Sequence, residues 1–191
     1  DLPSFFDWRR TTTTDRTSSL TNNIIPVIRD QNILHGTCWT FAAFASYESN
    51  WNLQLRQAGN TTDSAPYFSS RYLSWLTYEL TLDNDPSTLQ HFSPWGKTIS
   101  TPDQIYSVGG TQQLVQAMLT RFGAVTNEQC PYSTGPMAGV DQVIAPTGLL
   151  HDMLGSFGNG NIHGYIKDNL AYYKELIKSY GALSMAMNPD W

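Results

Sequence analysis

The feature that most constrains the fold is a long helical pattern that begins after Thr37 and continues to about Gln57. Apolar and small residues recur along two neighbouring stripes of that helix. One stripe contains Cys38, Phe41, Ala42, Ala45, Ser49 and Asn52, and the other contains Phe44, Tyr47, Trp51 and Leu55. Because most of this surface is apolar or small, we expect the helix to be largely buried. Thr37 is suited to cap its N-terminus, and the pair Gly59-Asn60 is suited to end it.

Three further segments have helical patterns, and extended segments lie near both ends of the chain. Helices are expected at 66–80, at 111–122 directly after Gly109-Gly110, and at 166–181 ending in Gly181. Residues 24–30 are expected to be extended, and 182–187 are expected to form a buried strand. Loops are expected at 11–23 and 81–105, and irregular or β structure at 130–161. This arrangement favours an α+β fold in two lobes.

Composition excludes several classes of function. The 191 residues are 40% hydrophobic and 14% charged, with a formal net charge of −5. We therefore expect a globular protein without a basic surface for nucleic acid or for an anionic membrane. No apolar run approaches the roughly 20 residues that cross a bilayer. The first residues lack a signal-peptide pattern and an initiator Met, so we expect an internal or processed start.

The number and spacing of the cysteines limit which disulfide and metal sites the chain can form. Cys38 and Cys130 do not make a disulfide framework, and no Cys/His cluster has the spacing of a zinc site, so neither a metal nor a cofactor is expected. One sequon, Asn60-Thr61-Thr62, would be glycosylated only in a eukaryotic secretory compartment.

Cys38 is placed at the first turn of the predicted helix, where backbone N–H groups are unpaired and the helix dipole is positive. This position favours the thiolate over the thiol and makes the sulfur nucleophilic. Gly36 permits a sharp turn and the close approach of a substrate, and Trp39 would shield one side of the thiolate. Gln31 would direct an amide N–H toward an oxygen that develops negative charge. These groups suit acyl transfer, whereas the alternative is that Cys38 is a small buried hydrophobic residue.

A series of short motifs follows the chain in a fixed order. They are Pro3, Asp7-Trp8-Arg9, Pro26-Val27, Asp30-Gln31, Gly36-Thr37-Cys38-Trp39, Phe41-Ala42, Glu48, Gly109-Gly110, Cys130-Pro131-Tyr132 and GALSMAM at 181–187. This series resembles the papain-like cysteine peptidases over almost the whole chain, and its Gly-Thr-Cys-Trp segment is closest in character to bacterial members. The resemblance implies a papain-like two-lobe fold, with a helical lobe at about 31–130. Parts of a β-rich lobe would come from about 1–30 and 131–191.

The resemblance also implies roles for individual residues. Cys38 would be the nucleophile, and Gln31 with the backbone N–H of Cys38 would form the oxyanion hole. Gly36 and Trp39 would lie along the substrate cleft, and Gly109-Gly110 would bind an extended peptide through their backbones. Two plainer alternatives remain: Gln31 as a solvated loop residue, and the glycine pair as a turn before the third helix.

The chain departs from the family pattern near the nucleophile. Gln31 precedes Cys38 by seven residues where the family has six, and His35 stands where many members have a disulfide-forming cysteine. Cys130 is expected to be a buried free thiol. His35 is expected to be a loop residue beside the cleft.

The catalytic base is the larger departure. The family places a histidine and an orienting asparagine roughly 130–150 residues after the cysteine. The histidines here are His35, His91, His151 and His163. His163 lies 125 residues after Cys38, close to that range, but it precedes the helix and strand that resemble the segment before the family's histidine. We expect it to be a core or surface residue, and the alternative is that it is the base. A motif at Asn188 and Trp191 is interrupted by Pro189. We therefore expect the histidine and asparagine outside these 191 residues, on a second chain or a further C-terminal segment.

The leading hypothesis is a peptidase that cleaves extended peptides through a thioester acyl-enzyme at Cys38. The alternatives are an inactive papain-like module that only binds peptides, and a transpeptidase or amide-forming acyltransferase. The expected partners are a peptide or protein substrate and the segment that carries the base. The expected location is a secreted, periplasmic or lysosome-like compartment after processing.

Overall fold

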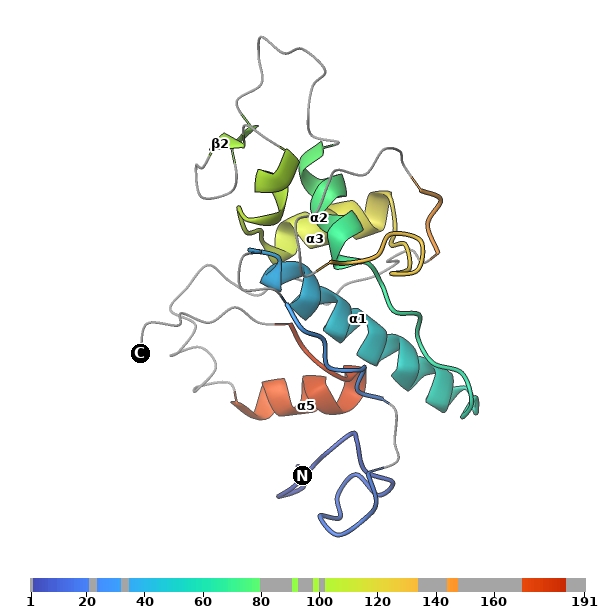
Figure 1. Cartoon of the computed structure of the whole chain (residues 1–191). Helices are drawn as coiled ribbons and strands as arrows, with labels where there is room; N and C mark the ends of the chain where they lie inside the picture. Colours follow the sequence, from blue (N-terminus) through green and yellow to red (C-terminus); the bar gives the residue numbers. More distant parts are fainter. Residues whose placement is uncertain are drawn as a thin grey trace. The chain divides into compact units, whose positions relative to one another are not determined.

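The computed structural model describes residues 2–20, 24–31, 35–79, 91–92, 98–99, 102–133, 144–147 and 170–184 (Figure 1). Its helices are α1 (Cys38–Gln57), α2 (Ser70–Glu79), the 3-10 helix η1 (Pro102–Tyr106), α3 (Gln112–Arg121) and α5 (Leu170–Tyr180). Strands β1 (His91–Phe92) and β2 (Thr98–Ile99) pair antiparallel, with His91 opposite Ile99 and Phe92 opposite Thr98. The described part of the chain is therefore mostly helical.

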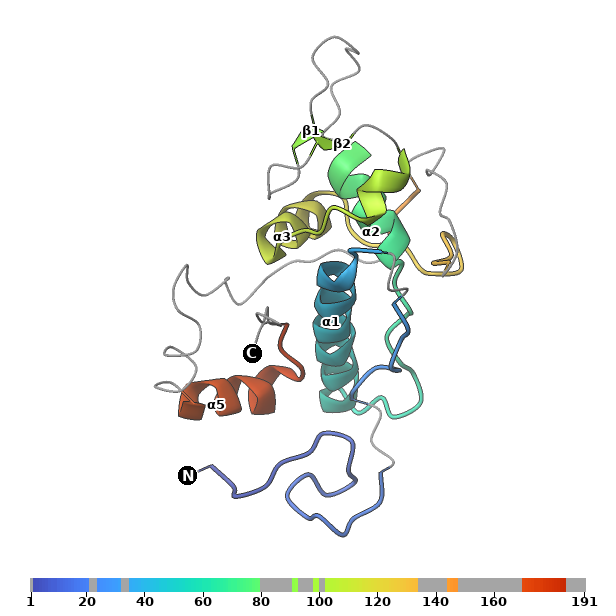
Figure 2. The ribbon, with the colours of Figure 1, turned by 60° about the vertical axis from the view of Figure 1, so that its left-hand side comes forward.

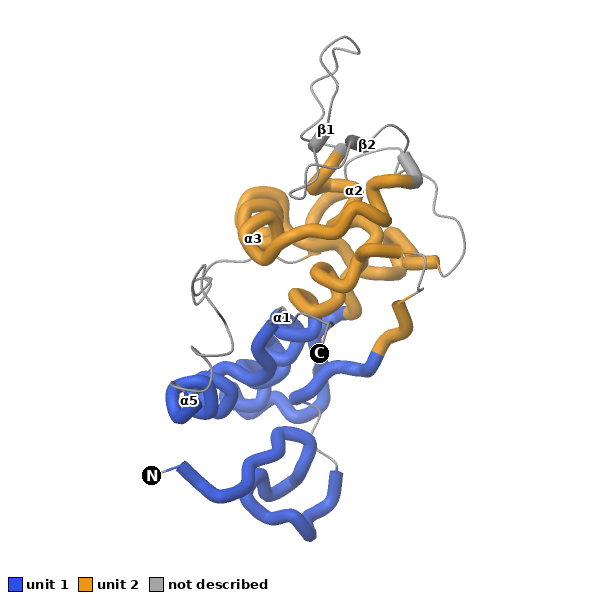
Figure 3. Tube along the Cα trace, turned by 90° about the vertical axis from the view of Figure 1, so that its left-hand side faces the viewer, with its two compact units in different colours: residues 1–28, 45–66, 157–191 blue, residues 29–44, 67–156 orange. Residues whose placement is uncertain are grey.

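The chain divides into two compact units (Figure 3). Unit 1 comprises residues 1–28, 45–66 and 157–191, and unit 2 comprises residues 29–44 and 67–156. Within unit 2, α2 packs against both α3 and η1, and Figures 1 and 2 present these elements from two sides. The papain-like two-lobe fold and its lobe boundaries stay a prediction, because much of 131–191 lies outside the described residues.

Helix α1 begins and ends where the sequence predicted. Gly59 adopts a φ of +81°, a left-handed conformation that favours glycine. The Gly59 N–H donates to the Arg56 carbonyl at 3.0 Å, and the Asn60 N–H donates to the Leu55 carbonyl at 2.9 Å. These two bonds form a Schellman motif, which satisfies carbonyls that the helix itself leaves unpaired.

The predicted burial of α1 is confirmed only in part. Phe44, Ser49 and Asn52 are buried, whereas Cys38 is exposed. Phe44 stacks on Phe68, with ring centroids 5.6 Å apart, in unit 2. The first residue of the helix, which carries the thiol, is therefore exposed, as are Gln54 and Gln57 near its other end.

Helix α2 begins four residues later than predicted, because the preceding segment pairs with another part of unit 2. Phe68 forms an antiparallel bridge with Thr126, and the Ser69 N–H donates to the Val125 carbonyl at 2.9 Å. The hydroxyl of Ser69 then accepts from the Tyr72 N–H at 3.0 Å, as an N-cap does. Residues 67–69 are thus held extended, and the helix starts at Ser70.

Helices α3 and α5 end at their C-termini where the sequence predicted. Thr111 caps α3 by accepting from the Leu114 N–H, and Gly123 follows that helix with a φ of +74°. Gly181, with a φ of +90°, follows α5. The predicted helical residues 166–169 lie outside the described chain. Residues 182–184 of the predicted strand carry no strand pairing in the structure, and 185–187 are not described.

Candidate active site

The thiol of Cys38 is exposed and unpaired on the first residue of α1. The Thr37 carbonyl accepts from the Phe41 N–H at 3.3 Å, so the regular hydrogen bonds of the α-helix start directly before the cysteine. The alternative in which Cys38 is a small buried hydrophobic residue is therefore wrong. Cys130, in contrast, is a buried free thiol as predicted, and burial raises its pKa.

Gly36 lies against the backbone of residues 106–109. Its N–H donates to the Tyr106 carbonyl at 2.6 Å. A Cβ atom at position 36 would lie 2.8 Å from the Ser107 carbonyl oxygen and 3.1 Å from the Gly109 nitrogen. Real Cβ atoms do not approach backbone oxygens that closely, so this contact requires glycine. The structure thus brings the segment before Cys38 together with the glycine pair.

Trp39 contacts the second glycine of that pair. A Cβ atom at Gly110 would overlap the indole ring of Trp39, which is itself buried. The edge of the Trp39 ring system meets Tyr78 of α2, with ring centroids 6.3 Å apart. Four residues predicted to form the substrate site, Gly36, Trp39, Gly109 and Gly110, therefore lie together in unit 2.

Tyr78 holds the glycine pair from the side of α2. Its hydroxyl donates to the Gly109 carbonyl at 2.5 Å. Burial raises the pKa of Tyr78 to about 12, so this hydroxyl keeps its proton and stays a donor at neutral pH. The contact of Tyr78 with Gly109 was not predicted, and the aromatic-rich helical segment in which Tyr78 lies was the only sequence signal for it.

The conformation of the glycine pair agrees with the plainer of its two predicted roles. Gly109 adopts a φ of +79°, and Gly110 is followed directly by Thr111, the N-cap of α3. The pair therefore forms the turn that precedes α3. Binding of an extended peptide by the same backbone stays a prediction.

Gln31 is tied to the loop that leads to Cys38. Its side-chain Nε2 donates to the His35 carbonyl at 2.6 Å, and the residue is half-buried. Gln31 is therefore a partly exposed loop residue, and its two predicted roles both stay predictions. An amide nitrogen carries two N–H groups, so this bond uses one of the two. Whether Gln31 serves an oxyanion stays a prediction.

A hydrogen-bonded group that the sequence analysis missed surrounds the residues before Cys38. The hydroxyl of Tyr132 lies 3.0 Å from Nδ1 of His35 and 2.9 Å from Oγ1 of Thr37. His35 is a half-buried loop residue, and burial lowers its pKa. Tyr132 appeared in the sequence only as part of the Cys-Pro-Tyr motif, which gave no sign of these contacts.

Several predicted features lie outside the described residues. These are the side chain of His91 and all of His151, His163, Asn188 and Trp191. The described part of the chain contains no cluster of three or more His, Cys, Asp or Glu residues that would hold a metal ion. Among its helices, none has the length and apolar character needed to cross a membrane.

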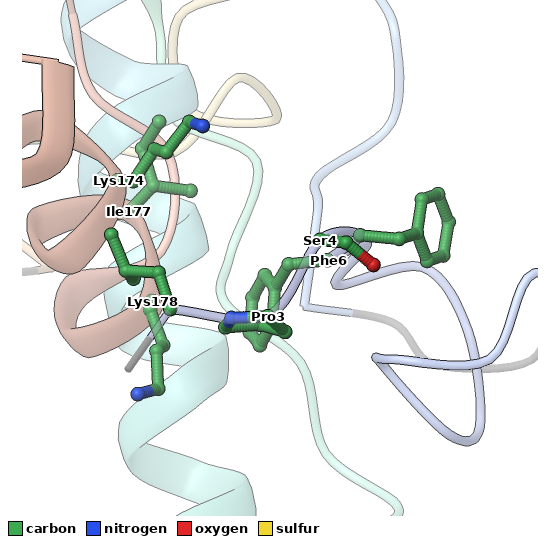
Figure 4. Close-up of a pocket in the computed structure, with 8 residues that line it drawn as sticks. Pro3, Ser4, Phe6, Lys174, Ile177 and Lys178 are labelled. Carbon is green, nitrogen blue, oxygen red and sulfur yellow. The ribbon is translucent and has the colours of Figure 1, made fainter.

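A cavity of about 170 Å³ occurs in unit 1. Its lining combines the N-terminal segment, from Leu2 to Phe6, with Lys174, Ile177 and Lys178 of α5 (Figure 4). The Trp8 indole N–H donates to the Ile177 carbonyl at 2.7 Å and anchors this segment to the helix. None of the six predicted site residues lines this cavity.

Comparison with known proteins leaves the family open. No family model matches the chain, and no curated protein matches it. The papain-like resemblance therefore stays a prediction that depends on the order and spacing of the motifs around Cys38.

Proposed function

We propose that this protein is a cysteine peptidase that hydrolyses peptide bonds in extended substrates through a thioester at Cys38. The observation that carries the proposal is an exposed thiol on the first residue of a helix of 20 residues. Such a position leaves the sulfur accessible to a substrate, and cysteine attacks as the thiolate. The gathering of Gly36, Trp39, Gly109 and Gly110 in the same unit supports the proposal.

The reaction would proceed in two steps. The Cys38 thiolate attacks the carbonyl carbon of the scissile peptide bond, and the carbonyl oxygen becomes an oxyanion. The Cys38 backbone N–H and the remaining amide N–H of Gln31 would donate to that oxyanion. Collapse of the intermediate breaks the C–N bond, and the leaving amine takes a proton from the protonated base. Water then attacks the thioester, releasing the carboxylic acid and returning the thiol.

The base in this proposal is a histidine oriented by an asparagine, and we place both outside these 191 residues. His35 is the histidine whose side chain is described, and its Nδ1 lies within hydrogen-bond distance of the Tyr132 hydroxyl. That contact gives the ring a structural partner. The family resemblance also places the catalytic histidine after the segment that corresponds to residues 181–187.

Hydrolysis of a quenched fluorescent peptide library by the reduced, full-length protein tests the proposal. We expect turnover by the unmodified protein and none by Cys38→Ser. The matched control is Cys130→Ser, which removes the buried thiol and is expected to keep turnover. Equal turnover by Cys38→Ser and the unmodified protein would overturn the proposal.

A second candidate function is an inactive module that only binds peptides. It is favoured by the bond between Gln31 and the His35 carbonyl, which directs one amide N–H into the protein's own loop. This candidate predicts that peptides bind equally well to Cys38→Ser and to the unmodified protein, and that neither cleaves them. Cleavage that Cys38→Ser abolishes without a change in peptide affinity would exclude the binding-only function.

A further inference from the structure

Tyr132 contacts the chain on both sides of Cys38. Its hydroxyl reaches His35 and Thr37, three residues and one residue before the cysteine. Its ring meets Phe41, one helical turn after the cysteine, edge to face with centroids 4.9 Å apart. We propose that Tyr132 is a positioning residue that holds Cys38 in place at the N-terminus of α1. This inference deepens the proposed function and rests on it, because it concerns the same nucleophile.

Two arrangements of the hydrogen bonds around the hydroxyl are consistent with a neutral His35, and the tautomer of the ring decides between them. Where Nδ1 carries no proton, Thr37 donates to the Tyr132 oxygen and the Tyr132 O–H donates to Nδ1; where Nδ1 carries the proton, both bonds run in the opposite direction. Burial lowers the pKa of His35 and so favours this neutral ring. Each of the three side chains thereby has a partner, and the segment from 35 to 37 is held as a unit.

Tyr132 is itself fixed within unit 2. Its backbone N–H donates to Oδ1 of Asn127 at 2.9 Å, and the Asn127 N–H donates to the Tyr67 carbonyl at 2.7 Å. Tyr67 belongs to the extended segment that leads into α2. The ring that contacts Phe41 is therefore attached to the body of the unit rather than to a free loop.

The consequence for Cys38 follows from its neighbours. The Thr37 carbonyl accepts both the Thr40 N–H at 3.0 Å and the Thr40 hydroxyl at 2.8 Å. Thr37 thus connects the hydroxyl of Tyr132 to the first turn of α1. Loss of the hydroxyl releases one side of that turn, while the ring still holds Phe41. Displacement of a nucleophile by about 1 Å reduces turnover by about a hundredfold.

Tyr132→Phe tests the inference, because it removes the hydroxyl and keeps the ring. We expect kcat for peptide hydrolysis to fall by about tenfold to a hundredfold with KM changed by less than about twofold. Alkylation of Cys38 by iodoacetamide is expected to slow severalfold. The control is Tyr72→Phe, which removes another tyrosine hydroxyl of unit 2, one that accepts from the Ile144 N–H at 3.0 Å. Tyr72→Phe is expected to leave both kcat and the rate of Cys38 alkylation unchanged.

Thr37→Val removes the same hydrogen bond from the other partner, because valine has no hydroxyl. It is expected to reproduce the Tyr132→Phe defect, whereas Thr37→Ser, which retains the hydroxyl, is expected to restore the unmodified rates. The double variant Thr37→Val/Tyr132→Phe is expected to fall no further than the slower single variant, because both remove one shared hydrogen bond.

The two readouts separate this inference from the proposed function. Slower alkylation of Cys38 in Tyr132→Phe, in a protein that does not hydrolyse peptides, would support the positioning role and overturn the peptidase. Equal kcat and equal alkylation in Tyr132→Phe, Tyr72→Phe and an active unmodified protein would overturn the positioning role alone.

Discussion

Substitution of Gly36 by alanine is the sharpest test of the described geometry, because the sign of its effect is fixed by the structure. The φ of Gly36 is not positive, so alanine is compatible with the backbone there. If space were available, the substitution would stabilise the protein by about 0.4–1 kcal/mol through the unfolded state. The added Cβ atom would instead lie 2.8 Å from the Ser107 carbonyl oxygen, and backbone atoms cannot rotate away.

We therefore expect Gly36→Ala to destabilise the protein by about 1–3 kcal/mol, the usual range for overpacking. For a chain of this size, each kcal/mol lowers the midpoint of thermal unfolding by about 2–4 °C. Thermal unfolding followed by circular dichroism measures the shift. Because Gly36 precedes Cys38 by two residues, the rate at which iodoacetamide alkylates Cys38 is also expected to change.

Gly59→Ala is the matched control for this experiment. A Cβ atom at position 59 meets no atom within 4 Å, but the φ of +81° strains alanine by about 1–2 kcal/mol. Gly59→Ala is therefore expected to lose comparable stability while Cys38 reacts at the unmodified rate. A Gly36→Ala protein as stable as the unmodified one, or more stable, would refute the close approach of residues 36 and 107–109.

Three further predictions follow from side chains in either unit. Tyr78→Phe removes the donor to the Gly109 carbonyl and is expected to destabilise the protein by about 1–2 kcal/mol, measured by urea unfolding; no loss would contradict that bond. Cys130 is expected to resist iodoacetamide at pH 7 in the folded protein and to react in urea, because burial raises its pKa; rapid labelling of the folded protein would contradict its burial. A hydrogen bond from Arg9 lowers the pKa of Asp7 from 3.8 to about 2. The stability that Asp7 contributes is therefore full above pH 3.8 and is lost as the pH falls through 2. Since Arg9 is exposed, the contribution is no more than about 1 kcal/mol, and unfolding of Asp7→Asn at pH 2 and pH 6 measures it; an equal loss at both would refute the assignment.

The helix ends were predictable because their signals are local. Gly59, Gly123 and Gly181 each follow a helix and adopt a positive φ, which depends on a few neighbouring residues. The predicted capping of α1 by the Thr37 side chain stays a prediction. The start of α2 was not predictable in this way. It is set by pairing of Phe68 with Thr126, which are far apart in the sequence.

The candidate site also combines features that local sequence signals predict with features that only tertiary packing determines. Local chemistry predicted a nucleophilic thiol at Cys38, and that role stays a prediction. The exposure of the thiol in the structure differs from the burial that the apolar pattern of the helix predicted. The gathering of Gly36 with Gly109 followed only from family resemblance, since no local pattern connects them. Tyr78 and Tyr132 were missed because their roles come from a single hydroxyl whose partner is chosen by tertiary packing. Residue type alone does not distinguish such a tyrosine from a core residue.

The most direct test of the central claim is to locate a covalent adduct on the reduced, full-length protein. The protein is incubated with a peptidyl epoxide, an electrophile that requires both a reactive thiolate and a bound peptide chain. Intact mass and peptide mapping then identify the modified residue. We expect one adduct, at Cys38, which excess substrate peptide delays and Cys38→Ser abolishes. A protein that stays unmodified, or carries the adduct on Cys130, would contradict the central claim.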